Sequence, residues 1–134
     1  MNKLNAIGLD SEKSANLAGK LSELLANYSI FYQNVRGYHW NIKGQKFFEL
    51  HLKFEELYND LQLKIDEVAE RILTLGHAPN HRYSDYAKSS AIVESSEVSD
   101  GMKAVADILN SFQTIITIQR ELLLLSAEAG DEGT

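Results

Sequence analysis

Apolar residues between Lys46 and Leu75 recur at steps of three and four, which is the period of a helix that buries one face. The members of this stripe are Phe47, Leu50, Phe54, Leu57, Leu61, Ile65, Val68, Ile72 and Leu75. The pattern predicts a long helix over 46–75 whose apolar stripe lies in a core.

Two further segments show the same period. Asp10, Ser11 and Glu12 are typical of a helix start, and the helix that they open is expected to run to Asn41. Its apolar stripe comprises Leu17, Leu21, Leu24, Tyr28, Phe31 and Val35, and His39 follows at the next step of four. A third long helix is expected over 99–127, ended by Gly130, with a buried line of Met102, Val105, Leu109, Phe112, Ile116 and Leu123. A short helix over 84–90 would interrupt the connection between the second and third long helices.

These segments predict an all-α fold in a single domain over residues 1–134. The broad apolar faces suit an antiparallel four-helix bundle, of which this chain supplies three long helices plus a short connecting helix. The fourth helix, at the carboxyl end, is absent from the sequence. If the chain is truncated, apolar surface on the first and third long helices should be uncovered.

The helix over 46–75 has a second, unusual face. At about 100° per residue, His51, Glu55, Asp66 and Glu70 occupy a sector next to the core stripe and away from the charged solvent face. This sector also carries the apolar residues Phe48, Leu52, Leu63 and Leu73. Unpaired carboxylates among apolar side chains are costly, so the face indicates a further interface that contains a metal.

Distance along the helix limits how these ligands combine. His51 and Glu55 are one turn apart, as are Asp66 and Glu70. The two pairs are separated by ~22 Å of helix, at 1.5 Å per residue. Either the pairs serve separate sites, or the helix meets a second copy antiparallel about a two-fold axis, which produces two equivalent shared sites. We favour the second geometry, and the short connection through Gly44 should bring His39 back toward His51.

Imidazole and carboxylate ligands together suit iron, with zinc and manganese as competitors for the same site. The imidazoles must be neutral to bind, so metal affinity should fall as the medium becomes acidic. Taken singly, each residue has an ordinary alternative role. A histidine on a helix flank is often structural, and Glu70 beside Arg71 could form a surface ion pair. For the group, the alternative is a polar dimer seam without metal.

The spacing of these residues resembles the signature of the miniferritins, the DNA-binding proteins from starved cells (Dps). The matching residues are His39, Trp40, Asn41, Gly44, Phe47, His51, Glu55, Asp66, Glu70, Arg71, Leu75 and Gly76, together with the terminal segment 129–134. The resemblance covers nearly the whole chain, except that such proteins normally continue with a fourth long helix.

The resemblance implies a ferroxidase that takes Fe²⁺ and hydrogen peroxide as substrates, stores the ferric product in a hollow dodecameric shell, and thereby limits oxidative damage. His39, His51, Asp66 and Glu70 would be catalytic, and Glu55 would join them as a metal ligand. Glu70 would bridge two iron ions whose ligands come from both chains. The resemblance also places Asp131 and Glu132 near a three-fold pore, although both could simply be solvated loop acids.

The net charge of −6 argues against a basic nucleic-acid surface, and Lys3 is the only basic residue ahead of the first helix. DNA binding is therefore possible but not favoured. The alternative function is a nucleoid-coating or structural oligomer whose site is vestigial or holds zinc. The chain has no cysteine, no signal peptide and no apolar run long enough for a membrane span, and we expect a cytoplasmic protein.

Three aromatic or imidazole side chains remain outside this set. Trp40, beside a ligand, could supply an electron or simply pack, and packing is the simpler interpretation. His77 and His81 flank a proline-containing loop and could hold a surface ion.

Overall fold

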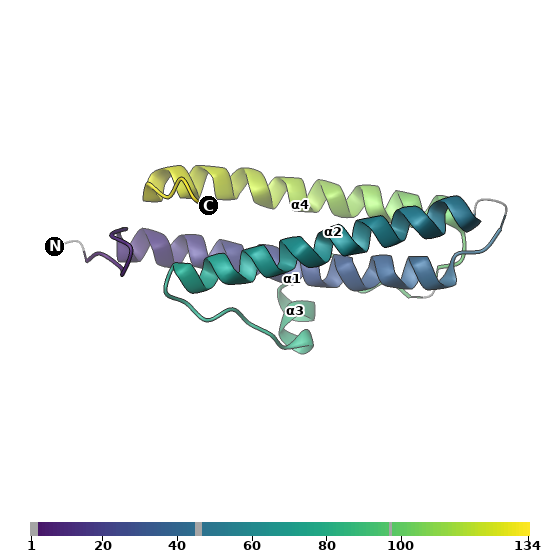
Figure 1. The fold of residues 1–134 in the computed structure, drawn as a ribbon, viewed down its shortest axis with the longest axis horizontal. Helices are drawn as coiled ribbons and strands as arrows, with labels where there is room; N and C mark the ends of the chain where they lie inside the picture. The colour runs from purple at the N-terminus through teal and green to yellow at the C-terminus, as the bar shows by residue number, and fades with distance from the viewer. Residues whose placement is uncertain (1–2, 45–46, 97) are drawn as a thin grey trace.

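The computed structural model describes residues 3–44, 47–96 and 98–134, and within these ranges its regular structure is helical. The four helices are α1 (Ser11–Asn41), α2 (Phe47–Thr74), α3 (Tyr83–Ser89) and α4 (Gly101–Ala129) (Figure 1). Two isolated β-bridges, and no strand, occur in the described part of the chain. The all-α prediction is confirmed. No helix in these ranges combines the length and apolar character that crossing a bilayer requires.

The helix ends follow the residues that the sequence offers for them. Asp10 caps α1, its carboxylate accepting a hydrogen bond from the Lys13 amide at 3.1 Å. Asp100 caps α4 in the same way through the Met102 amide at 3.4 Å. Gly130, at φ 68°, adopts the left-handed conformation that ends α4, as expected. The last helical residue is Ala129, two positions beyond the expected 127.

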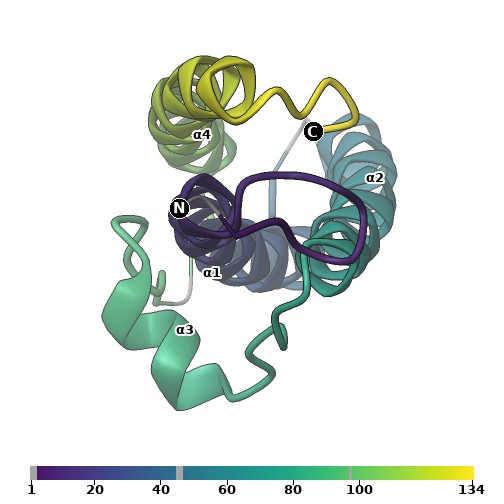
Figure 2. The same cartoon turned by 90° about the vertical axis from the view of Figure 1, so that its left-hand side faces the viewer.

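Helix α1 is the centre of the fold. The ribbon in Figure 1 shows α2 and α4 running in the same direction, antiparallel to α1. Seen end-on in Figure 2, α2 and α4 lie on two sides of α1, and α3 lies on another. Helix α1 packs against all three. Its buried side chains therefore form the central part of the core, among them Leu17, Leu25, Phe31 and Val35.

The predicted core stripe of α2 is confirmed. Phe54, Leu61, Ile72 and the following Leu75 are buried. The remaining members are partly buried and pack against the core: Phe47, Leu50, Leu57, Ile65 and Val68. Helical period was sufficient here because the second apolar face of α2 also carries histidine and carboxylate side chains, which distinguish it from the core stripe.

The buried line predicted for α4 is wrong. Met102, Leu109, Phe112, Ile116 and Leu123 are exposed, and Val105 is only half-buried. The residues of α4 that are buried in the core include instead Ala104, Ile108, Ser111, Ile115, Ile118 and Leu122. From the predicted line, Val105 packs against the core, and the Phe112 ring meets Phe31 edge-on. Helix α4 has two apolar stripes, and the one with small residues faces α1 because small side chains let two helices approach closely.

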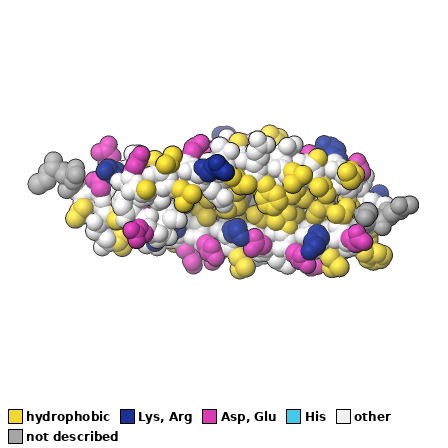
Figure 3. All heavy atoms as spheres, turned by 90° about the horizontal axis from the view of Figure 1, so that it is seen from above, with side chains coloured by type: hydrophobic (Ala, Val, Ile, Leu, Met, Phe, Trp, Pro, Cys, Tyr) yellow, Lys and Arg dark blue, Asp and Glu magenta, His cyan; other side chains and the backbone are white. Residues whose placement is uncertain are grey.

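The second stripe of α4 borders an open side of the molecule. Figure 3 shows apolar side chains gathered on the face above α1, between α4 and α2. A cavity of about 440 Å³ between the same three helices, near the end of α4, is lined by Leu21 and Leu24 of α1, Val68 of α2 and Leu123 of α4. Uncovered apolar surface was thus correctly expected on α4. On α1 the core side chains lie beneath α2 and α4, whereas Trp40 is exposed.

Two buried asparagines of α1 fasten the long connection between α2 and α4. The Asn27 side-chain oxygen accepts hydrogen bonds from the Ala91 and Ile92 amides at 3.0 and 3.1 Å. The Asn34 oxygen accepts from the Ser95 amide at 2.8 Å. Each asparagine satisfies main-chain groups that would otherwise be buried without partners, so the connection lies along α1.

Candidate metal centre

His39 and His51 meet where α1 and α2 are joined. The short connection after Asn41 folds α2 back along α1, which places the last turn of α1 beside the first turns of α2. The two imidazole rings stack with centroids 3.6 Å apart and an angle of 15° between their planes. The prediction that His39 returns to His51 is confirmed.

Hydrogen bonds fix the orientation of both rings. The His39 Nδ1 lies 2.6 Å from the His51 carbonyl oxygen, and the His51 Nδ1 lies 2.7 Å from the His39 carbonyl oxygen. A carbonyl oxygen only accepts, so each Nδ1 must carry the hydrogen and donate it. In the neutral ring, Nε2 then holds a free lone pair, which is the form that binds a metal ion. The pair is therefore prepared to present two nitrogen ligands.

Aromatic rings enclose this pair. The ring of Tyr58 meets His39 edge-on, with centroids 5.3 Å apart, and Phe47 stacks on His51 at 4.9 Å. His39 is buried and His51 is half-buried. The rings consequently have little freedom to turn away, which favours a rigid ligand pair over a mobile one.

The carboxylates of the predicted site are distributed along α2. Glu55 is half-buried one turn beyond His51, whereas Asp66 and Glu70 are exposed farther along the helix. Among the described residues of one chain, no three histidine, cysteine, aspartate or glutamate side chains form a group able to hold a metal ion. The structure brings together His39 and His51 and leaves Asp66 and Glu70 apart from them.

The face that carries these carboxylates is unusually apolar for a surface. Phe48, Leu52, Leu63 and Leu73 are between 57% and 77% exposed. Large apolar side chains spaced along one helix face, with ligand-type residues between them, are typical of a surface that another protein covers.

The possible pairing of Glu70 with Arg71 does not occur. The Arg71 guanidinium binds the Asp131 carboxylate instead, and its Nε donates to the Thr134 hydroxyl at 2.8 Å. Asp131 is only 4% exposed, so its interpretation as a solvated loop acid is wrong. Asp131 fastens the chain end to α2, whereas the pore role of Glu132 stays a prediction.

Trp40 packs on the surface rather than in the core. Its ring is 55% exposed and lies beneath the Arg36 guanidinium, 4.8 Å from the ring centroid. The packing interpretation therefore holds only for one face of the ring.

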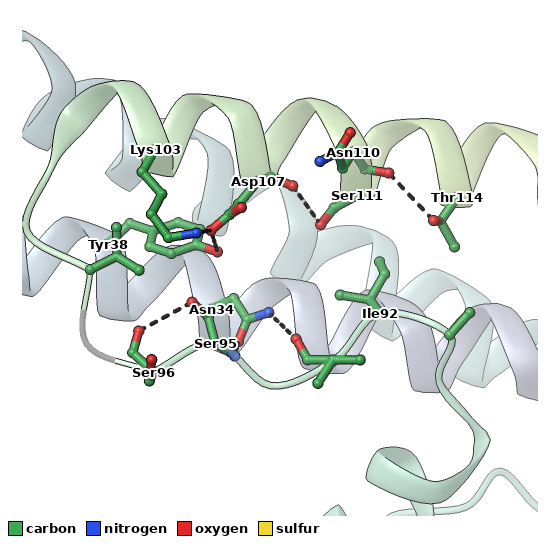
Figure 4. A pocket seen from close by; sticks show the side chains of 13 residues that line it. Asn34, Tyr38, Ile92, Ser95, Ser96, Lys103, Asp107, Asn110, Ser111 and Thr114 are labelled. Carbon is green, nitrogen blue, oxygen red and sulfur yellow. Dashed lines mark hydrogen bonds and ion pairs between the residues drawn. The ribbon is translucent and has the colours of Figure 1, made fainter.

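A polar pocket, shown in Figure 4, lies between α1, α4 and residues 91–96 and 98 of the connection, and has a volume of about 390 Å³. Its polar groups bind one another. Tyr38 donates to Asp107 at 3.5 Å, and Asp107 also pairs with Lys103 at 3.5 Å. Burial raises the pKa of the Tyr38 hydroxyl, so this group stays neutral. The pocket is a weaker ligand site than the histidine pair because its donors already have partners.

Sequence reasoning missed Tyr58 and the two carbonyl oxygens that orient the imidazoles. Tyr58 lies seven residues after His51, which places it on nearly the same side of α2, so helical period could have found it. The carbonyl contacts left no signal in the sequence, since every residue has a carbonyl.

Comparison with known proteins gives this arrangement a family. The model of the ferritin-like domain family matches residues 18–134. A protein of Porphyromonas gingivalis named "DNA protection during starvation protein" is 41% identical over 98% of this chain and 82% of its own length. An uncharacterized protein of Haemophilus influenzae is 55% identical over 96% of this chain and 81% of its own length.

Solved structures agree with these relatives. The crystal structure of a Dps protein from Vibrio cholerae, described as a member of the ferritin-like diiron-carboxylate superfamily, has a TM-score of 0.95 and 53% identity, over 97% of this chain and 82% of its own. A Dps protein from Bacillus brevis has a TM-score of 0.88 and 30% identity, over 91% and 82%. The predicted ferritin-like fold class is confirmed, and the chain belongs to the Dps family of ferritin-like proteins.

Proposed function

We propose that this protein oxidises Fe²⁺ and stores the ferric product, at sites that two chains build together. The observation that carries the proposal is the His39–His51 pair, whose Nδ1 atoms are both bound to carbonyl oxygens and whose Nε2 atoms are left to bind a metal, with neither Asp66 nor Glu70 beside it. A second copy, related by a two-fold axis with its α2 antiparallel, would supply Asp66 and Glu70 to each histidine pair.

The donor set fits iron as the substrate. Two imidazoles with several carboxylates are borderline to hard ligands, which suit Fe²⁺ and accept Fe³⁺ equally well. Zinc and manganese compete for such a set, so either ion is a candidate occupant and inhibitor. In the proposed site His39, His51 and Glu55 come from one chain, and Asp66 and Glu70 come from its partner.

We assign hydrogen peroxide as the oxidant on the family resemblance. Each of two Fe²⁺ ions gives one electron to peroxide, which takes up two protons and leaves as two water molecules. The residues of the chain position the two ions and exclude bulk water, through the aromatic walls of Phe47 and Tyr58. Two-electron reduction of peroxide avoids hydroxyl radical, in accordance with a protective role. Assembly into a dodecameric shell and a cytoplasmic location are part of the same proposal.

Iron oxidation in the presence of peroxide tests this function. Anaerobic protein is mixed with Fe²⁺ and hydrogen peroxide, and ferric absorbance is followed for the parent chain and for His51→Ala and Glu70→Ala variants. We expect the variants to lose at least about 90% of the initial rate, as is usual when a metal ligand is removed. Equal rates in all three proteins would overturn the proposal.

The second candidate is DNA coating, favoured by the name of the Porphyromonas gingivalis relative. The net charge of −6 opposes it, because counterion release from DNA needs clustered lysine and arginine. A gel-shift titration at low salt separates the two functions. Retention of DNA that disappears as salt is added would support the DNA-coating function.

A further inference from the structure

The loop that follows α2 brings an imidazole into the cavity that Asp66 lines. This cavity, of about 740 Å³, lies between α2 and residues 79–81. Asp66 and His81 both line it, although they are 15 residues apart in the sequence. The amide side chains of Asn59, Gln62 and Asn80 line the same space. The other lining residues are apolar or aromatic: Leu25, Leu63, Ile65, Ala69, Pro79 and Tyr86. One chain alone therefore places one carboxylate, one imidazole and neutral amide groups around a cavity whose remaining wall is apolar.

Hydrogen bonds stabilise the loop next to His81. The Tyr86 hydroxyl donates to the Asn80 carbonyl oxygen at 2.5 Å, and the Arg82 amide donates to the Asn80 side-chain oxygen at 3.3 Å. These bonds hold the residues on both sides of His81 against the start of α3, and Pro79 restricts the chain further. His81 consequently has a defined position at the cavity instead of the freedom of a loop tip.

His77 shows that this placement is selective. It belongs to the same loop and is also exposed, yet it does not line the cavity. From the sequence, His77 and His81 could together hold a surface ion, with no distinction between them. The structure separates them and associates His81 with a residue of the proposed iron site.

We propose that His81 and Asp66 together bind a divalent transition-metal ion in this cavity. A neutral imidazole nitrogen and a carboxylate oxygen favour Fe²⁺, Zn²⁺ or Mn²⁺ over Mg²⁺ and Ca²⁺, which take oxygen ligands. Binding needs only one chain. Its use, to hold Fe²⁺ at the Asp66 half of the centre before oxidation, rests on the proposed function.

Zinc binding provides a test that does not depend on iron oxidation. Full-length protein that carries His51→Ala, to remove the zinc expected at the histidine pair, is dialysed against limiting Zn²⁺. Retained zinc per chain is measured for this parent, for the added His81→Gln and for the matched control His77→Gln. His81→Gln should bind this zinc at least about tenfold more weakly, the loss typical when a metal site is depleted of one partner. His77→Gln should match the parent. Equal retention in all three proteins would overturn the proposal.

Chemical modification locates the effect. Diethyl pyrocarbonate carbethoxylates free imidazoles, so Zn²⁺ should protect His81, and leave His77 reactive, when peptides are analysed by mass spectrometry. Protection of His81 should be lost in Asp66→Asn and kept in His51→Ala. Zinc-dependent protection that survives Asp66→Asn would contradict the shared site.

The two proposals fail differently. Iron oxidation that depends on His51, with zinc retention that does not depend on His81, would overturn only the His81 site. Zinc retention that depends on His81, with iron oxidation indifferent to His51, would support the His81 site and overturn the proposed function.

Discussion

The Nδ1 atoms of His39 and His51 each lie within 2.7 Å of the other residue's carbonyl oxygen, so the two histidines orient each other through their main chains. This reciprocal arrangement joins the end of α1 to the start of α2 and leaves both Nε2 atoms available. The same contacts that stabilise the helix connection therefore also prepare the metal ligands.

The two roles of His51 can be separated by substitution. In His51→Asn, the side-chain amide nitrogen replaces Nδ1 and can still donate to the His39 carbonyl oxygen. The asparagine side chain has no counterpart of Nε2 to bind a metal. We expect thermal stability close to the parent together with loss of iron oxidation. His51→Ala should lose iron oxidation and should also lose about 1 kcal/mol of stability, because the hydrogen bond to the His39 carbonyl is missing.

Thermal melts by circular dichroism check this difference. If His51→Asn is destabilised as strongly as His51→Ala, the orienting bond does not have the strength assigned to it.

The two stripes of α4 predict opposite outcomes for neighbouring isoleucines. Ile115 is 4% exposed and packs in the core, whereas Ile116 is 47% exposed. Ile115→Ala should lower the free energy of unfolding by about 2 to 4 kcal/mol, because it leaves a cavity against α1. Ile116→Ala should lower it by less than about 1 kcal/mol. Urea unfolding of the two variants measures the difference, and equal losses would contradict the register described for α4.

The ion pair between Asp131 and Arg71 should contribute to stability. Asp131→Ala leaves the guanidinium without its partner, and we expect a loss of about 2 kcal/mol. The value is below that of a fully buried pair, since the Arg71 side chain is 26% exposed. Glu132→Ala is the control and should have almost no effect, because Glu132 is exposed. Urea midpoints that fall equally for both variants would show that Arg71 does not depend on Asp131.

Buried Tyr28 predicts a loss of stability in alkali. Burial raises the pKa of its hydroxyl above the ordinary value of 10.0, although the Gln119 amide, which donates to it at 2.8 Å, acts in the opposite direction. A raised pKa in the folded state means that the folded chain holds this proton more tightly than the unfolded chain does. The contribution is therefore complete below about pH 10 and is lost as pH rises through the folded pKa.

Unfolding free energies at about pH 9 and about pH 11 test this. The decrease should be smaller in Tyr28→Phe than in the parent. Tyr83→Phe, at a residue that is 78% exposed, should leave the decrease unchanged. An identical decrease in Tyr28→Phe would exclude Tyr28 as its source.

Helical period predicted the three long helices. It also predicted the core stripe of α2, because the second apolar face of that helix carries histidine and carboxylate side chains that distinguish it from the core. It was wrong for α4, where two apolar stripes compete and only packing against α1 decides between them. The fastening of the long connection by Asn27 and Asn34 could not be predicted, since those contacts join residues about 60 positions apart.

For the candidate site, ligand spacing predicted that His39 lies beside His51 and that Asp66 and Glu70 lie beyond their reach. It did not distinguish His81 from His77, because the course of an irregular loop has no period.

Subunit complementation tests most directly whether two chains build each iron site. His51→Ala and Glu70→Ala chains, each inactive alone, are co-assembled in equal amounts, and iron oxidation is measured. In a mixed pair, one of the two sites receives His51 and Glu70 from unmodified positions, so random pairing should restore about a quarter of the parent rate. A mixture as inactive as its components, although mixed pairs are detected by mass spectrometry, would contradict a shared site.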